Sequence, residues 1–404
     1  MPRWGRLCYR SVPDPQLSAA CGLLDAAAGP LHPQAIQTLL AAVDAGWADP
    51  RRLYREARVA GGLLEQARAT IAADLQVPAQ TLSFHLGGAG AALAAGLDGL
   101  LWPARRRGAR VVASAVEHSS ILIPSRYAAA QAAEPRLLAE VPVDGFGAVL
   151  LPQWAGAVAE PGTAVAALQY ANGEVGTLQP VDAAYQHSRA AGVPLLVDAT
   201  ASLGRYPAPR TYDVLAGDAA TVAGPPLGLL VVPETVPFRR AGPPREAEFG
   251  RADAPVWVPL ALCAAEAWQQ AAAQREADAA QAHALTERIR VAAAAIPDVE
   301  FVGDPDHRLP HVVTLSALFT DGETLVTELD RRALAVASGS ACTASTLEPS
   351  HVLAAMGVLT HGNVRITLPW AAVAPDREAA VERLIALLPE VIASVRAGLG
   401  ASGL

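Results

Sequence analysis

The sequence predicts an α/β protein in which a large, helix-covered β-sheet is followed by a smaller α+β domain. Between residues 82 and 232, short apolar runs alternate with helical stretches, as expected for a parallel or mixed sheet covered by helices. A Pro- and Gly-rich segment at 233–255 then interrupts this pattern, and a different one follows. The chain has 404 residues, of which 52% are hydrophobic, so apolar material suffices for a sizeable core.

Strand candidates in the first part are short, apolar and bounded by Gly, Pro or Asp, which is typical of buried strands. They lie at 82–86, 109–114, 164–170, 194–197 and 227–232. A Gly-rich turn at 87–90 leads directly from the first of these strands into an alanine-rich helix at 91–101.

The second part begins with a long helix, near 259–295. A strand at 311–315, a helix at 322–332, a strand at 333–337, a loop, a strand at 363–368 and a helix at 376–399 follow. The predicted large domain spans 23–250. The small domain combines 1–22 with 251–404, because we expect the N-terminal segment to pack beside it.

Composition excludes several classes of function. The formal net charge is −8 and no extended basic stripe is present, which argues against binding nucleic acid or an anionic membrane. No apolar run suits a signal peptide or a membrane span, so we expect a soluble, cytoplasmic protein. The four cysteines are too scattered for a disulfide framework, and none has metal-ligand spacing to a histidine.

The chain contains no lysine: all 31 residues counted under Lys+Arg are arginines. A GC-rich genome that favours Ala, Gly, Pro and Arg would explain scattered surface losses of lysine. It would not explain the loss of a catalytic amine, because a guanidinium stays protonated and forms no Schiff base.

The segment 337–353, Ala-Ser-Gly-Ser-Ala-Cys-Thr-Ala-Ser-Thr-Leu-Glu-Pro-Ser-His-Val-Leu, closely resembles the mobile loop of the cysteine desulfurases. These are class V aminotransferase relatives that use pyridoxal phosphate (PLP), and their loop cysteine accepts sulfur from bound cysteine as a persulfide. Cys342 occupies that position among small residues that suit a moving segment. A buried structural thiol is the alternative, and reactivity would require a lowered thiol pKa.

The resemblance extends from about residue 23 to residue 396. It implies the type I PLP-transferase fold: a large α/β/α domain with a mixed seven-stranded sheet, and a small α+β domain. It also implies a homodimer, because active sites of this family lie at the subunit interface.

Two residues match positions near the substrate. Arg365, in Gly-Asn-Val-Arg-Ile-Thr-Leu, resembles the arginine whose guanidinium binds both oxygens of the substrate carboxylate. Asn172, in Tyr-Ala-Asn-Gly-Glu-Val-Gly, resembles the asparagine near cofactor and substrate. A surface arginine and a turn asparagine before glycine are the respective alternatives.

Two others match cofactor contacts. His118, in Val-Glu-His-Ser-Ser, resembles the histidine that stacks on the pyridine ring and serves as an acid–base group. Asp198, in Leu-Val-Asp-Ala-Thr, resembles the aspartate that keeps the pyridine nitrogen protonated. It also ends a predicted strand, where α/β sheets bind ligands, although a cap or turn aspartate would look the same.

The departures from the family cluster around one ligand. The family stretch Ser-Gly-His-Lys-x-x-Gly-Pro corresponds here to Asp-Ala-Ala-Thr-Val-Ala-Gly-Pro, residues 218–225. Thr221 therefore replaces the Schiff-base lysine, Ala220 replaces the histidine, and Asp218 replaces a serine that contacts the cofactor phosphate. Ala201 replaces a glutamine that bonds the pyridine oxygen.

The Gly-rich turn keeps the Gly88 and Ala89 amides at a helix N-terminus, a usable anion cradle, without the family's Thr and Glu. Near 251–256, where the family's partner subunit lends a threonine, the sequence reads Ala-Asp-Ala. Each missing donor would cost roughly 0.5–3 kcal/mol. We therefore expect no covalently bound cofactor, and PLP at most weakly and noncovalently.

Three functional hypotheses follow. The leading one is a sulfur-handling partner subunit or persulfide relay through Cys342, working with an active desulfurase or a sulfur-acceptor protein. The second is an enzyme with a repurposed pocket, in which His118, Asp198 and Asp218 provide acid–base groups around noncovalent PLP or another ligand. The third is a structural or regulatory dimer partner.

Overall fold

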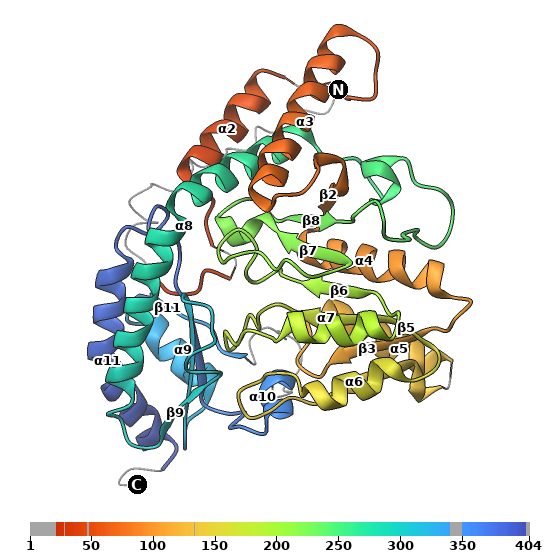
Figure 1. Ribbon diagram of the computed structural model, residues 1–404. Helices are drawn as coiled ribbons and strands as arrows, with labels where there is room; N and C mark the ends of the chain where they lie inside the picture. The colour runs from red at the N-terminus through yellow and green to blue at the C-terminus, as the bar shows by residue number, and fades with distance from the viewer. Residues whose placement is uncertain (1–21, 28, 47, 133, 340–349, 401–404) are drawn as a thin grey trace, which may run out of the picture.

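A computed structural model describes residues 22–27, 29–46, 48–132, 134–339 and 350–400. Figure 1 shows a large sheet with helices on both faces and, beside it, a smaller sheet flanked by helix α11 (Arg377–Gly398) and part of α8 (Val258–Ala293). Helices α2 (Pro33–Asp44) and α3 (Arg55–Leu75) pack against α8 at one end of the molecule.

The large sheet has seven strands in the order β2-β8-β7-β6-β5-β3-β4. Their bounds are β2 Leu82–Leu86, β3 Arg110–Ser114, β4 Leu138–Val141, β5 Thr163–Gln169, β6 Leu195–Asp198, β7 Val214–Asp218 and β8 Leu227–Val231. Only β8 is antiparallel to its neighbours. The carboxyl ends of β2, β7, β6, β5 and β3 therefore meet at one edge.

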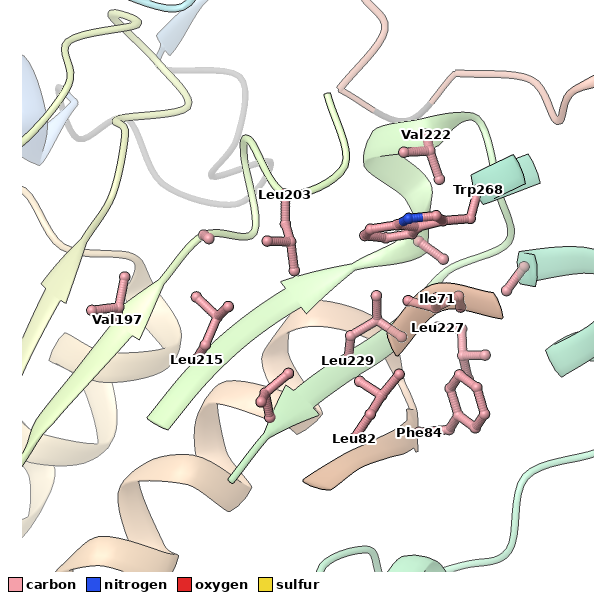
Figure 2. Close-up of a cluster of buried hydrophobic side chains, with 14 of the residues drawn as sticks. Ile71, Leu82, Phe84, Val197, Leu203, Leu215, Val222, Leu227, Leu229 and Trp268 are labelled. Carbon is pink, nitrogen blue, oxygen red and sulfur yellow. The ribbon is translucent and has the colours of Figure 1, made fainter. Parts of the chain in front are cut away.

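Alternate residues of these strands enter two different cores, as the period of a strand requires. Leu196 and Leu230 face helices α4 (Gly88–Ala104) and α5 (Ser119–Gln131). Leu215 and Leu229 face the opposite side, with α3, α6 (Leu151–Ala159), α7 (Val181–Ala190) and the first half of α8. Figure 2 shows this second core, in which Ile71 of α3 and Trp268 of α8 lie over the strands.

The small sheet has three antiparallel strands, with β10 (Val312–Ala317) between β12 (Asn363–Thr367) and β9 (Val299–Val302). Helices α9 (Gly322–Asp330) and α11 pack against it. The strand expected at 333–337 is shorter: β11 comprises Leu334–Ala335 and pairs in parallel with β1, Gly22–Leu23, outside the three-stranded sheet.

Helix α8 joins the two cores. Its first half packs on the large sheet through residues such as Ala264 and Trp268. Its second half packs on the small sheet through Leu285 and Ile289. One helix therefore contributes to both cores. The domain division at residue 251 remains a prediction.

Two expectations about local structure were wrong or incomplete. The predicted turn at 87–90 is largely helical: α4 begins at Gly88, and only Gly87 (φ +98°) and Gly88 (φ +67°) adopt the left-handed backbone that glycine allows. Strands β4 and β7 were not among the strand candidates, because Leu-Ala-Glu-Val and Val-Leu-Ala-Gly-Asp contain residues with weak strand preference. β7 is buried between β6 and β8, and β4 pairs with β3 at the edge of the sheet, so pairing with neighbours overrides that preference.

Within the described parts of the chain, no helix is long and apolar enough to cross a membrane. Over the same residues, no group of three or more His, Cys, Asp or Glu side chains could hold a metal ion.

Candidate functional site

The residues that the sequence singled out follow successive strands of the large sheet. His118 lies beyond β3, Asn172 beyond β5, Asp198 ends β6 and Asp218 ends β7. Gly88 follows β2 at the same edge. Parallel strand order therefore brings them to the edge where α/β sheets bind ligands, while Arg365 comes from β12 of the small sheet.

Asp218 fills the anion cradle at the start of α4. Its Oδ2 accepts a 2.5 Å hydrogen bond from the Ala89 amide, and its Oδ1 accepts one of 2.9 Å from the Ala220 amide. The residue is only 7% exposed, and a Cβ atom at Gly88 would lie 2.8 Å from Oδ2. The chain's own carboxylate thus caps the helix, where the macrodipole favours negative charge.

Burial raises the pKa of Asp218, and hydrogen bonds from the Ala220, Ala89 and Leu227 amides oppose that rise. Strand β8 closes the cradle from the other side, because a Cβ atom at Gly228 would lie 2.3 Å from the Gly88 carbonyl oxygen. A phosphate on this helix terminus would have to compete with Asp218 for the Ala89 amide.

Thr221, which the resemblance predicts at the position of the family lysine, forms hydrogen bonds with the backbone. It lies in the short 3₁₀ helix Ala219–Val222, and its hydroxyl donates towards the carbonyl oxygens of Leu203 (2.5 Å) and Asp218 (2.7 Å). Its own carbonyl accepts a 2.9 Å hydrogen bond from Trp370 Nε1. Thr221 therefore has no amine, and its hydroxyl is already hydrogen-bonded to backbone carbonyl groups.

Polar groups near Thr221 also have partners within the chain. The Arg205 guanidinium lies over the Trp370 ring at 5.1 Å and donates a 2.7 Å hydrogen bond to the Leu368 carbonyl. Burial lowers the pKa of Arg205 to about 10. Ala201, which the resemblance predicts at the position of the family glutamine, would be in ordinary contact (3.4 Å) with a Cβ atom at Gly173, and its side chain has no polar group.

His118 and Asn172 both serve as local backbone partners. His118 is exposed and caps α5, its Nδ1 accepting a 3.1 Å hydrogen bond from the Ser120 amide. Asn172 Oδ1 accepts from the amides of Glu174 (2.8 Å) and Val175 (2.9 Å). The turn role left open for Asn172 by its sequence is thus the role that its side-chain oxygen has here.

Asp198 has a buried acid beside it. Its Oδ1 accepts hydrogen bonds from the amide (2.8 Å) and hydroxyl (2.6 Å) of Thr200. Glu117 is fully buried, and its Oε1 accepts from the Gln169 amide at 2.7 Å. Burial, and then the Asp198 charge, raise the pKa of Glu117 well above its ordinary value. Glu117 was not among the predicted site residues, although an acid directly before His118 was a visible signal.

Arg365 lies on β12 and is 7% exposed, with Nη2 3.5 Å from Asp25 Oδ1. A second carboxyl, that of the partly buried Glu174, lies nearby. Burial raises the pKa of Glu174, while its hydrogen bond from Ser350 and the charge of Arg365 act in the opposite direction. Glu174 was also overlooked, although it stands in the Asn-Gly-Glu-Val-Gly motif.

Cys342 lies outside the described residues, as does the whole of 340–349. Gly339 and Ser350 are the described residues on either side of this segment. Cys263 is buried in the large core, where burial raises its thiol pKa to about 11, so it is a poor nucleophile.

The arrangement belongs to a known class of proteins. The sequence profile of the aminotransferase class-V family matches residues 23–212 and 241–376. The chain therefore belongs to this family, which uses PLP and includes the cysteine desulfurases. The unmatched stretch, 213–240, contains β7, β8 and the Asp218–Thr221 segment.

Cysteine desulfurases are among the most similar relatives. The cysteine desulfurase of Cereibacter sphaeroides is 29% identical over 91% of this chain and 94% of its own length. That of Rhodobacter capsulatus is 31% identical over 83% and 87%. Cysteine desulfurase IscS 1 of Archaeoglobus fulgidus is 32% identical over 72% and 76%.

Solved structures confirm the type I fold, with its seven-stranded mixed sheet and small α+β domain. A NifS-like protein superimposes with a TM-score of 0.80, at 21% identity, over 91% of this chain and 98% of its own. The cysteine desulfurase CsdA of Escherichia coli gives a TM-score of 0.77, at 18% identity, over 94% and 97%.

The residues present do not fit the family's PLP. Asp218 accepts from the Ala89 amide at the start of α4, and Thr221 and Ala201, at the predicted positions of the family lysine and glutamine, have no amine and no ring donor. Asp198, Asn172 and Arg365 keep side chains of the expected type in buried positions.

Proposed function

We propose that this chain is a cysteine-desulfurase-like protein that does not release sulfur from cysteine by its own PLP chemistry. It handles sulfur as a partner subunit, or accepts and relays a persulfide on Cys342. The observation that supports this most strongly is the Asp218 carboxylate on the Ala89 amide, beside a threonine that replaces the lysine.

The Asp218 carboxylate disfavours a phosphate at this place for electrostatic reasons. A phosphate needs several oriented donors, and a resident carboxylate both removes one and repels the anion. No lysine elsewhere in the chain can replace the missing amine, because the sequence has none. We therefore infer that PLP is not bound covalently and binds at most weakly.

The relay step is a thiol–persulfide exchange. The Cys342 thiolate attacks the outer sulfur of a persulfide on a donor protein, a new S–S bond forms at Cys342, and the donor leaves as a thiolate. The proton of the outer sulfhydryl stays with the transferred sulfur. No external oxidant or reductant is required, because one S–S bond replaces another.

Two partners follow from this proposal. The first is a second copy of the chain, since a homodimer is the expected arrangement of the fold. The second is an active desulfurase that supplies the persulfide, or a protein that accepts the sulfur from Cys342.

The decisive experiment incubates the chain with an active cysteine desulfurase and cysteine, followed by trypsin and mass spectrometry. Cleavage after Arg332 and Arg365 would release a peptide with Cys342 as its only cysteine. We expect one added sulfur atom on this peptide and none in the variant C342S.

Two outcomes would overturn the proposal. One is the absence of a persulfide on Cys342 together with an unchanged activity of the partner desulfurase; that result would favour a purely structural role. The other is a bound-cofactor absorption band in the chain mixed with PLP and cysteine, with release of alanine and sulfide.

A repurposed pocket is the second candidate, and one observation favours it. Glu117 is a fully buried acid with a raised pKa next to Asp198, so the pair could hold and release a proton. In contrast, both carboxylate oxygens of Asp218 already accept hydrogen bonds, from the Ala89 and Ala220 amides. Turnover of any ligand that disappears in E117Q but survives in D218A would support this candidate.

A further inference from the structure

Residues between 232 and 251, which follow β8, line a cavity of about 430 Å³ at the β2 end of the large sheet. Their loop extends beyond β2 and β8 in Figure 1. The volume lies within the range of pockets that bind small molecules, about 300–1,000 Å³. None of the described residues of the candidate site lines this cavity. It is therefore a second, separate place where a small molecule could bind.

One wall of the cavity is fixed to helix α4. A Cβ atom at Gly99 would lie 2.1 Å from the Phe238 ring, so this ring packs directly on the helix backbone. The Arg239 amide donates a 2.9 Å hydrogen bond to the Gly99 carbonyl oxygen. The Asp98 carboxylate accepts a 3.2 Å hydrogen bond from the Ala241 amide. The fold itself therefore holds this wall in place.

A second wall is fixed to α3 and β2 through Glu248. This carboxylate lies 2.7 Å from the guanidinium of the buried Arg68 and accepts a 2.9 Å hydrogen bond from the Phe84 amide. Glu248 (φ +49°) and Phe249 (φ +59°) both adopt the left-handed backbone conformation, which is strained for residues other than glycine. Strain of this kind persists where the surrounding contacts enforce it, and it is concentrated at ligand sites.

Phe249 offers an aromatic surface beside the cavity. The Arg68 guanidinium lies over its ring, 4.9 Å from the ring centre. Arg68 is buried, whereas Phe249 is 52% exposed, so the ring keeps one face open. An exposed ring held in a strained backbone is suited to stacking with a planar ligand.

Basic side chains outnumber acidic ones on the cavity lining, although the formal net charge of the chain is −8. Arg240 and Arg245 share the Asp253 carboxylate, at 2.9 and 2.6 Å, and Arg240 also pairs with Asp98 at 3.2 Å. Among the described residues that line the cavity, Glu234 is the only acidic one. The basic ones are Arg239, Arg240, Arg245 and Arg251.

Two of these arginines form no ion pair within the described parts of the chain. Arg251 donates to the carbonyl oxygens of Gln80 (3.0 Å) and Thr81 (2.8 Å) instead. The exposed Arg239 has its guanidinium 6.0 Å from the centre of the Trp102 ring. Because no carboxylate neutralises these two charges directly, an anion in the cavity would be attracted by both.

We propose that this cavity binds a nucleotide, with its phosphate groups at the arginines and its base on the Phe249 ring. Guanidinium groups bind phosphate oxygens through charge-assisted hydrogen bonds, and aromatic side chains stack on nucleobases. Inorganic pyrophosphate shares the first interaction but lacks the ring. The inference goes beyond the proposed function, because it concerns another part of the molecule and requires no sulfur transfer.

Isothermal titration calorimetry of the full chain with ADP, pyrophosphate and adenosine tests this proposal. We expect ADP to bind saturably at a single site and more tightly than pyrophosphate, which cannot stack. Adenosine should bind more weakly than ADP, because it lacks the phosphate groups. The affinity for ADP should fall as the NaCl concentration is raised, since salt screens exposed charges.

Three variants and one control locate the binding. R239E should weaken the binding of both ADP and pyrophosphate roughly tenfold, the effect of losing a charged hydrogen-bond donor. F249A should weaken ADP roughly tenfold and leave pyrophosphate within about twofold of wild type. E234Q removes the acidic side chain and should tighten both ligands about twofold. R210E, at an exposed position outside the loop, should bind like wild type.

A wild-type chain that shows no saturable binding of ADP would overturn the proposal. Equal losses of affinity in R239E and R210E would also overturn it, because the ligand would then respond to the charge of the whole chain. If F249A weakened pyrophosphate as much as ADP, the base would not stack on Phe249 and the ligand would not be recognised as a nucleotide. Circular dichroism confirms that each variant is folded, and R239E and E234Q keep the test valid if F249A is not.

Discussion

Two edges of the candidate site differ in how they satisfy their polar groups. At the edge formed by β7 and the start of α4, Asp218 and Thr221 bond to backbone groups of their own chain. At the edge formed by β12 and α10, the partly buried Glu174 lies near the charge of Arg365 and accepts a hydrogen bond from Ser350.

The family profile divides at the same place. It matches the residues around Glu174 and Arg365 but not 213–240, which include Asp218 and Thr221. At the edge that contains Asp218, an internal carboxylate provides negative charge at the start of α4.

The largest expected effect comes from placing the family's serine and lysine at positions 218 and 221. The double variant D218S/T221K should free the Ala89 amide and supply an amine, and should therefore form a borohydride-reducible covalent adduct with PLP on residue 221. Mass spectrometry gives this test a low background, because wild type has no lysine side chain to modify. T221K alone should react much less.

An equally complete adduct in T221K alone would show that Asp218 does not obstruct the phosphate. That result would contradict the proposed difference between the two edges, because the Asp218 edge could then still bind the cofactor.

A smaller effect, on the free energy of unfolding, is expected when one glycine at each edge is replaced by alanine. In G228A the new Cβ would lie 2.3 Å from the Gly88 carbonyl oxygen, and backbone cannot move aside cheaply. We expect a loss of about 1–3 kcal/mol in the free energy of unfolding. In G173A the nearest atom would be the Ala201 Cβ at 3.4 Å, so a change within about 0.5 kcal/mol is expected.

Urea unfolding followed by circular dichroism measures both glycine variants. Equal stability of G228A and wild type would mean that the packing of β8 on the Gly88 turn is not tight, and that the cradle could open for a ligand.

The smallest effect concerns the pH dependence of stability. The pKa of Glu117 is raised well above 4.5 in the folded protein, so the folded state binds more protons than the unfolded state above that pH. Its contribution to stability is complete below about pH 4.5 and is lost as pH rises towards the folded pKa. E117Q, which can still accept from the Gln169 amide, should therefore gain stability relative to wild type as pH rises.

Unfolding curves at several pH values above 4.5 would show this difference. E276Q, at an exposed position on α8, is the control and should show no such trend. A constant difference between E117Q and wild type across this range would contradict the shift.

Much of the fold was predictable because apolar runs and breakers mark buried strands. Five of the seven strands of the large sheet and the long helix α8 were recognised in this way. Strands β4 and β7 escaped because they are short and contain Ala, Gly or Glu, so only their neighbours in the sheet make them strands. Asp218 at the end of β7 was found by resemblance to a motif rather than by strand pattern.

The family and the absence of any lysine can be read from the sequence alone, because motifs and composition do not depend on distances between residues. The partners of Asp218 and Glu174 become visible only in the folded chain. Asp218 and Ala89 are 129 positions apart, and Glu174 and Ser350 are 176 apart. Such contacts arise from sheet order and domain packing, which bring together groups that no local sequence pattern relates.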